Sequence, residues 1–313
     1  MRIFFATDVH GSEVCFRKFL NARQVYEPDA MIIGGDITGK VLVPIVGEDG
    51  GAWTARTNYG DVTLEGEEAL RAYEREIADV GSYTVRLPED EYEAIRNDAE
   101  RVDRAFHDAV LARVEAWMEL AAERLADTDI PLFVSGGNDD YWEVDDVLKS
   151  ASRVTCPDRD VVELGPFDLL SFGAANQTPW ECPRDMSEEE LGQVYDSLIA
   201  KLDGGRPAIF NLHVPPYGTP LDEAPLLDEN QRPTASMTGT ELAPVGSTAV
   251  RAAIEEAQPL LSLHGHVHES RAAAKIGRST VLNPGSEYSQ GVLRAAIVDV
   301  DERKVRRHQF ITG

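Results

Sequence analysis

Residues 3–11 read Ile3-Phe4-Phe5-Ala6-Thr7-Asp8-Val9-His10-Gly11, an apolar run that stops at a carboxylate, an imidazole and a glycine. A short apolar run that ends in a polar turn predicts a buried strand followed by a functional loop. The design recurs at 30–36, where Ala-Met-Ile-Ile precedes Gly-Gly-Asp, and at 132–139, where Leu-Phe-Val-Ser precedes Gly-Gly-Asn-Asp. Three strands of this kind predict a layered α/β fold in which strand ends carry the chemistry.

The rest of the chain continues the alternation of strands and helices. Apolar runs predict further strands at 161–164, 169–172, 208–212, 260–263, 280–282 and 294–300. A helix is expected over 12–25, and the capping-box pattern Ser187-Glu188-Glu189-Glu190 predicts another that runs towards Leu202. With 313 residues and 42% apolar composition, we expect one large domain over 1–313.

The alternation of predicted strands and helices is interrupted over residues 40–130, which we interpret as an insertion. Residues 41–46 resemble a strand, and charged, helix-favouring residues follow. Apolar residues from Tyr92 to Leu125 fall at steps of three and four, which predicts one helix of roughly nine turns. We expect this mainly helical cap to pack its apolar stripe against the main domain or, in a homo-oligomer, against a partner subunit.

The charge balance restricts the partners of the protein. The chain has 6 Lys and 24 Arg against 55 Asp and Glu, a formal net charge of −25. This resembles the acidic, lysine-poor surfaces of halophilic proteins, where salt screens the repulsion; an acidic mesophilic protein is the alternative. Since no large basic cluster occurs, we expect no stable binding to nucleic acid.

Composition also bears on the compartment. No stretch of the sequence approaches the ~20 apolar residues that a membrane span requires, so no membrane partner is expected. The first apolar run ends at Asp8 and is too short for the apolar region of a signal peptide. Cys15, Cys156 and Cys182 do not form a cluster in the sequence. We therefore expect a cytoplasmic protein.

Five motifs bring candidate metal ligands to the ends of predicted strands, which gather on one edge of an open sheet. Carboxylate, amide and imidazole ligands suit divalent Mn, Fe, Co, Zn or Ni. Each motif alone also fits an ordinary turn or core histidine, but their combination in one chain favours a metal site. We treat His107 and His308 as surface residues and His264 as structural. The candidate ligands are Asp8, His10, Asp36, Asn138, His213, His266 and His268.

This series, from Asp8-x-His10 through Gly35-Asp36 and Gly137-Asn138 to His213 and Gly265-His-x-His268, resembles the calcineurin-like metallophosphoesterase superfamily. The resemblance covers nearly the whole chain apart from 40–130, and Asn283-Pro284-Gly285-Ser286 also resembles compact prokaryotic members. It implies a four-layer αββα sandwich that holds two divalent metal ions. Manganese is expected, with Fe, Zn, Co or Ni as alternatives. The resemblance implies that Asp8, His10 and His268 hold one metal, that Asn138, His213 and His266 hold the other, and that Asp36 bridges them.

Two positions depart from the family pattern. Many members carry His directly after the Asn, whereas this chain has Asp139 followed by Asp140. Asp139, next to Asn138, is therefore a candidate proton donor. The alternative hypothesis is that Asp139 or Asp140 only orients the imidazole of His10. Gly39 stands where some branches carry an Asp three residues after the bridging Asp. The latter departure concerns the branch of the family rather than metal binding.

The expected function is hydrolysis of a small-molecule phosphate ester by in-line attack of a hydroxide that bridges the two metals. A phosphodiester or nucleotide-type ester is favoured because position 139 lacks the His that assists the leaving group. The alternatives are a phosphomonoesterase or protein phosphatase, and a non-catalytic scaffold on the same fold. A DNA exonuclease is disfavoured by the acidic charge. Because the insertion supplies no predicted ligand, we expect its removal over 47–125 to leave the metal site formed.

Overall fold

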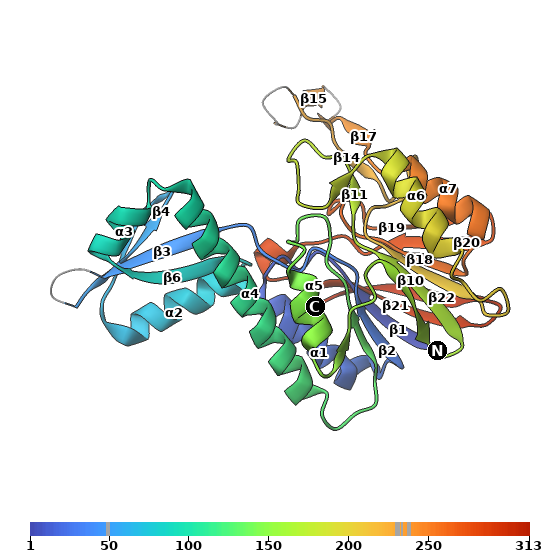
Figure 1. Cartoon of the computed structure of the whole chain (residues 1–313), viewed down its shortest axis with the longest axis horizontal. Helices are drawn as coiled ribbons and strands as arrows, with labels where there is room; N and C mark the ends of the chain where they lie inside the picture. The colour runs from blue at the N-terminus through green and yellow to red at the C-terminus, as the bar shows by residue number, and fades with distance from the viewer. Residues whose placement is uncertain (48–50, 229–231, 233, 237–238) are drawn as a thin grey trace.

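The computed structural model describes residues 1–47, 51–228, 232, 234–236 and 239–313. Two six-stranded sheets form the centre of the main body (Figure 1). The first sheet has the order β22-β21-β1-β2-β7-β8 and the second the order β19-β20-β18-β13-β10-β9. The first sheet consists of β1 (Arg2–Ala6), β2 (Ala30–Ile33), β7 (Leu132–Val134), β8 (Val154–Thr155), β21 (Arg294–Asp301) and β22 (Lys304–Thr312). The second consists of β9 (Asp160–Leu164), β10 (Phe167–Phe172), β13 (Ala208–Leu212), β18 (Leu261–Leu263), β19 (Ala272–Ile276) and β20 (Ser279–Asn283).

Alternation along the strands explains why the two sheets pack together. Successive side chains of a strand point to opposite faces. In β1, Ile3 and Phe5 join a core between the sheets with Leu169 and Leu263, whereas Phe4 turns to the helices on the other face. Each sheet is thus buried on both faces, which accounts for the continuous apolar runs of its strands.

Helices cover both outer faces and complete four layers. The first sheet is covered by α1 (Glu13–Tyr26), part of α4 (Ala99–Arg124) and α5 (Val144–Ser150), and the second by α6 (Glu188–Ile199) and α7 (Thr248–Ala257). Ser187 caps α6 through the expected capping box. The αββα sandwich expected from the sequence is confirmed. No helix in the described part of the chain combines the length and apolar composition needed to cross a bilayer.

Short pairs of strands lie outside the two large sheets, and one single-turn helix precedes β21. These elements are β11 (Ala175–Asn176), β12 (Asp185–Met186), β14 (Glu223–Pro225), β15 (Ala235–Ser236), β16 (Gly239–Thr240), β17 (Leu242–Pro244) and the 3₁₀ helix η1 (Tyr288–Gln290).

The segment expected as a mainly helical insertion has more residues in helices than in strands, but it also contains a sheet of its own. A four-stranded sheet in the order β5-β4-β3-β6 lies to one side of the main body, with α2 and α3 against it (Figure 1). A small separate core of Val43, Ile45, Ala55, Leu64 and Leu70 holds it together. The elements are β3 (Leu42–Gly47), β4 (Trp53–Thr57), β5 (Gly60–Leu64), α2 (Gly66–Asp79), β6 (Tyr83–Pro88) and α3 (Glu89–Ile95).

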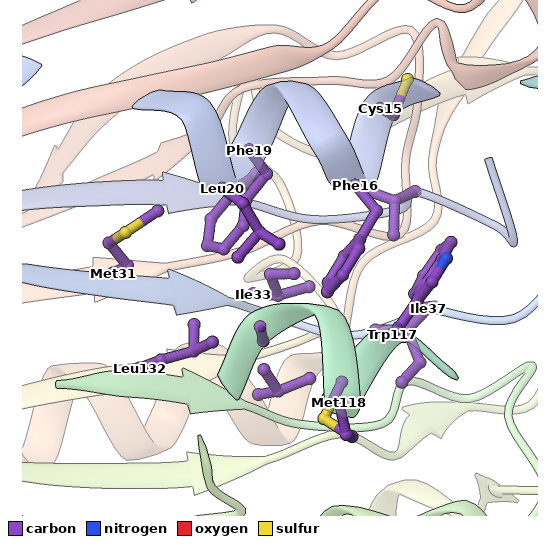
Figure 2. Packing of buried hydrophobic residues seen from close by; sticks show 14 of the residues in the cluster. Cys15, Phe16, Phe19, Leu20, Met31, Ile33, Ile37, Trp117, Met118 and Leu132 are labelled. Atoms are coloured by element: carbon purple, nitrogen blue, oxygen red, sulfur yellow. The ribbon is translucent and has the colours of Figure 1, made fainter. Parts of the chain in front are cut away.

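The apolar stripe from Tyr92 to Leu125 is divided between two helices rather than lying on one. Helix α3 ends at Ile95, and α4 begins after Asp98, whose side chain accepts from the backbone N–H of Arg101 as a new N-cap. The later part of α4 belongs to the core of the main body. Its Trp117 stacks on Phe16 of α1 with ring centroids 4.2 Å apart (Figure 2). The insertion therefore packs against the main domain, which is one of the two arrangements that the sequence left open.

Candidate metal centre

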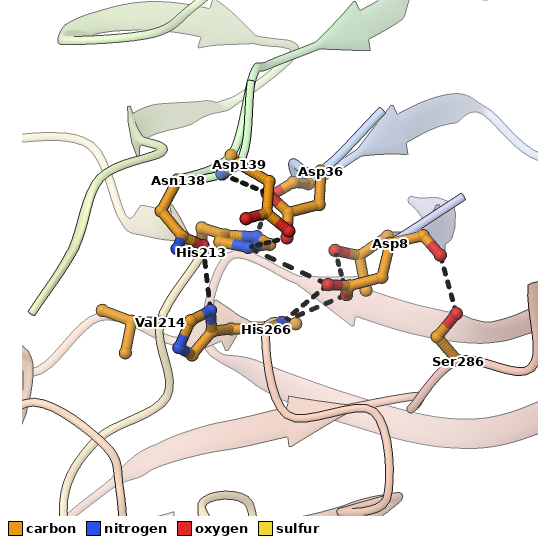
Figure 3. A network of polar contacts seen from close by, with 12 residues as sticks. Asp8, Asp36, Asn138, Asp139, His213, Val214, His266 and Ser286 are labelled. Atoms are coloured by element: carbon orange, nitrogen blue, oxygen red, sulfur yellow. Dashed lines mark hydrogen bonds and ion pairs between the residues drawn. The ribbon is translucent and has the colours of Figure 1, made fainter. Parts of the chain in front are cut away.

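The parallel pairing of β1 with β2 brings their two loops side by side. Asp8 donates its backbone N–H to the carbonyl oxygen of Gly35 at 3.0 Å, and His10 donates to that of Asp36 at 3.0 Å. The loop after β7 follows closely, because a Cβ at Gly137 would collide with the backbone and side chain of Asp36. These strand-end contacts place Asp8, His10 and Asp36 in one buried cluster, which Figure 3 shows in part.

The Asp8 carboxylate is surrounded by imidazole nitrogens. Its Oδ1 lies 3.4 Å from Nε2 of His268, 3.9 Å from Nε2 of His213 and 4.0 Å from Nε2 of His10. The backbone N–H of His266 donates to both carboxylate oxygens, at 3.0 and 3.1 Å. Asp8 thus joins the ends of strands from both large sheets.

Asp36 occupies the middle of the cluster. Its Oδ2 lies 3.2 Å from Nε2 of His213 and 3.6 Å from Nε2 of His10. Both nitrogens therefore lie within 4.0 Å of the Asp36 and Asp8 carboxylates. A carboxylate in this position can reach ligands on either side of it.

Backbone carbonyls set the orientation of two imidazoles. His10 Nδ1 lies 3.2 Å from the carbonyl oxygen of Thr38, and His213 Nδ1 lies 3.1 Å from that of Gly34. Because a carbonyl oxygen only accepts, Nδ1 carries a proton in both rings and Nε2 is the nitrogen that faces the carboxylates. A ring oriented through one nitrogen in this way can offer the other nitrogen to a metal ion.

The Asn138 side chain is also fixed by a partner. Its Nδ2 donates to Oδ1 of Asp185 at 3.0 Å, which turns the amide oxygen inward. That oxygen lies 2.9 Å from His266 Nδ1 (Figure 3). An oxygen and a nitrogen, the two ligand types expected here, therefore face one another.

The site loops hold strained backbone. Of the eight non-glycine residues with positive φ in the described part of the chain, four are Asp8, His10, Asp36 and His266, at φ values of 39° to 66°. Such conformations cost about 1–3 kcal/mol each and persist only where surrounding contacts enforce them. Their concentration at the strand ends is typical of a functional site.

Burial and charge act in opposite directions on the titrating groups. Burial lowers the pKa of His10 and of His266 to about 4, so both rings are neutral at pH 7. Burial alone would raise the pKa of Asp36, but the neighbouring His213 and His10 hold it well below its usual range. For His213, burial is outweighed by Asp36 and Asp8, which raise its pKa to about 10. Ionised carboxylates among imidazole nitrogens form a site that favours a cation.

The donor set fits divalent metal ions. Nε2 of His10 and Nε2 of His268 face each other at 3.1 Å, and the buried Nε2 of His213 makes no hydrogen bond. Donor atoms gather within 4.8 Å of one another in two sets that share no residue, Asp8 with His10 and His268, and Asp36 with His213 and His266. All seven predicted ligands therefore lie in this region, with Asn138 joined to the second set through His266.

The two acidic residues after Asn138 differ in their contacts. Asp140 accepts from the backbone N–H groups of Ile37, Thr38 and Gly137, so it ties the loops of Asp36 and Asn138 together. It reaches His10 only through Thr38, whose carbonyl oxygen lies beside that ring. Asp139 lies farther out, with Oδ2 4.0 Å from His10 Nδ1 and in an ion pair with Lys40.

Other contact residues were not found from the sequence. Asp185 lies 47 residues from its partner Asn138, and no pattern marks it. Lys40 directly follows the loop of Asp36 and pairs with Asp139. Because the chain has only 6 Lys, a lysine next to a candidate ligand loop is the one signal that could have indicated it. Ser286, in the motif noted after the Gly-His-x-His segment, donates to the carbonyl oxygen of Asp8 at 2.6 Å. Tyr288 places its ring 4.6 Å from that of His10.

The chain resembles known proteins in sequence and in structure. No protein-family model matches the chain. Over 150 residues it is 32% identical to the uncharacterized protein MJ1162 of Methanocaldococcus jannaschii, a match that spans 47% of this chain and 61% of that protein. The structure of TT1561 from Thermus thermophilus superposes with a TM-score of 0.54 at 15% identity, over all of this chain and 97% of that one.

A more distant likeness is to a structure described as a novel archaeal phosphodiesterase, with a TM-score of 0.38 and 10% identity over the full length of both chains. That likeness is too distant to carry a function across. The match to TT1561 shows a shared fold. The chain therefore shares its four-layer fold with TT1561. The Asp-x-His, Gly-Asp, Gly-Asn, His and Gly-His-x-His series at its strand ends resembles that of the calcineurin-like metallophosphoesterase superfamily.

Proposed function

We propose that this protein is a metal-dependent phosphoesterase that hydrolyses a phosphodiester or a nucleotide-type phosphate ester. The observation that carries the proposal is the pair of largely buried donor sets, one of which contains Asp36. Proteins that use such a fold only as a scaffold have no need for a full ligand set, whereas all seven positions are filled in this chain.

In this proposal Asp8, His10 and His268 would hold one divalent ion, Asn138, His213 and His266 would hold the second, and Asp36 would contact both. Two such ions would supply Lewis-acid activation of water and of the phosphoryl oxygens. The residues of the chain contribute positioning. Thr38 and Gly34 fix the two imidazole tautomers, and Asp185 fixes the amide of Asn138. Because Asn138 is neutral, it adds no charge that would repel an anionic substrate.

The test is hydrolysis of bis-p-nitrophenyl phosphate, compared with p-nitrophenyl phosphate, with Mn²⁺ added to metal-stripped protein. We expect Mn²⁺-dependent turnover with the diester preferred. Asp36→Asn should abolish activity and lower the metal content more than any other single ligand change. Asp160→Asn, at an exposed carboxylate outside the site, is the matched control. Absence of turnover at full metal content would favour the scaffold alternative, and full metal content in Asp36→Asn would contradict the bridging assignment.

A further inference from the structure

Lys40 joins the root of the insertion to the exposed side of the candidate site. It directly follows the loop that carries Asp36 and lies just before β3. Its Nζ forms an ion pair with Oδ2 of Asp139, the residue after Asn138. About half of the Lys40 side chain is exposed, whereas that of Asp139 is 13% exposed. The ammonium group thus lies between the buried cluster and solvent.

The ion pair lies close to the donor sets. Donor atoms of His10, Asp36 and Asp139 all lie within 4.8 Å of one another, so the Lys40 ammonium is one side chain away from Asp36. Among the ion pairs of the described residues, Lys40 is the only Lys or Arg paired with a predicted site residue; the others are histidines.

The insertion fixes the backbone next to Lys40. The N–H of Gly39 donates to the hydroxyl of Tyr83 in β6 at 2.8 Å. A side chain at position 39 would collide with the carbonyl of Gly81, so loop and insertion touch backbone to backbone. The insertion therefore holds the backbone of Gly39, directly before Lys40, and Asp139 holds the tip of the Lys40 side chain. Such preorganisation lowers the entropy that a flexible lysine loses on binding.

We propose that Lys40 is a substrate-binding residue whose ammonium group contacts a non-bridging oxygen of the phosphoryl group, with Asp139 as its positioning residue. The inference rests on the proposed function and deepens it. An ammonium group has three donors, and Asp139 accepts from one side, which leaves donors for an anion. In a chain with a net charge of −25, a local cation offsets the repulsion that an anionic ester meets on approach.

The test measures binding of inorganic phosphate by calorimetry to Mn²⁺-loaded wild type, Lys40→Met, Lys40→Arg and Lys201→Met, beside hydrolysis of bis-p-nitrophenyl phosphate. Lys201 pairs with Asp160 on an exposed surface and has an exposed fraction close to that of Lys40. Since hydrogen bonds to charged groups are the stronger class, we expect Lys40→Met to weaken phosphate binding and kcat/KM about 10- to 100-fold. The metal content should be unchanged, Lys40→Arg should recover part of the loss, and Lys201→Met should match wild type.

Equal phosphate affinity in Lys40→Met and wild type would overturn the inference, as would a wild-type protein that binds no phosphate. Loss of metal from Lys40→Met would also overturn it, because Lys40 would then act on the site structure. If the wild type hydrolyses neither ester but its phosphate affinity still depends on Lys40, the anion contact stands and the proposed function fails.

Discussion

At the scale of single residues, the candidate site depends on side chains that aim other side chains. Asn138 has an amide whose oxygen and nitrogen differ by a half-turn about one bond, so its orientation must be enforced. Asp185 does this through Oδ1, while its Oδ2 accepts from the backbone N–H of Thr178 and of Cys182. Asp185 is thus fixed by its own loop before it fixes Asn138.

We predict that Asp185→Asn weakens one of the two metal sites about 10- to 100-fold, the loss typical of residues that orient ligands. An amide at position 185 can offer a donor as well as an acceptor, so it no longer forces the oxygen of Asn138 inward. Metal titration by calorimetry checks this, with Asp160→Asn as control. Two sites of unchanged affinity would contradict the orienting role of Asp185.

A second prediction at this scale concerns Asp139, which the sequence marked as a candidate catalytic residue. Asp139→Ala should reduce kcat/KM about 10- to 100-fold without emptying the metal site. If Asp139 acts by holding Lys40, the same substitution should cost little more in a Lys40→Met background, since the effects of coupled residues do not add. Kinetics of both single variants and the double variant measure this. Fully additive losses would show that the two residues act independently, and complete metal loss would make Asp139 a ligand.

At the scale of elements, the insertion is part of the support for the site. Ser12 donates to the carbonyl oxygen of Asp79 at 2.6 Å, and Arg113 of α4 donates to that of Gly11 at 3.0 Å. Trp117 and its neighbours on α4 fill the core over the first sheet. The expectation that the metal site stays formed when residues 47–125 are removed stays a prediction, and the deletion would also take away these contacts.

The contact between the insertion and the site predicts that a substitution in the insertion, at Gly81, changes metal binding. Gly81 has φ of +89°, and a Cβ there would fall on the carbonyl oxygen of His10. Gly81→Ala should therefore displace the His10 loop, lower the Tm and weaken metal binding. Gly66 has φ of +78° with nothing near its missing Cβ, so Gly66→Ala reports the backbone strain alone. Melting curves with and without Mn²⁺ compare the two variants. An equal Tm and an equal metal-induced shift would rule out this coupling.

At the scale of the whole molecule, the dominant quantity is the net charge of −25. Thirty cationic side chains cannot pair with 55 carboxylates, so a compact fold brings unpaired negative charges together. Exposed pairs such as Arg17 with Glu13 contribute little to stability. Screening of the remaining repulsion extends over ~10 Å at 0.1 M salt and shortens to ~3 Å at 1 M.

We predict that the Tm and the activity both rise markedly from 0.1 to 2 M KCl. Chloride is the suitable anion, because sulfate or phosphate would strengthen apolar burial and phosphate would compete for the site. Metal ions should be saturating throughout, since they neutralise part of the carboxylate charge. A Tm that stays flat or falls over this range would mean that the acidity is not an adaptation to salt.

The sequence by itself predicted most strands of the two large sheets, though not β8, β19 or β22, and it predicted seven candidate ligands at strand ends. Strands such as Ala30–Ile33 and Ala208–Leu212 were predicted with the bounds observed, because burial on both faces leaves an uninterrupted apolar run. Each ligand is local to such a strand end. The clustering then follows from the rule that parallel strands end at one edge of a sheet.

Only the tertiary structure decided what surrounds that cluster. It formed the sheet of the insertion and the break before α4. It also brought together residues far apart in the chain, Lys40 with Asp139 and Asp185 with Asn138. No periodicity records such contacts, because the pattern of a segment reports which of its faces is buried and not which partner buries it. Lys40 lies in a loop and Asp185 in the two-residue strand β12, and neither segment has a pattern of apolar residues that would indicate its partner. The partners of both residues are therefore settled by packing alone.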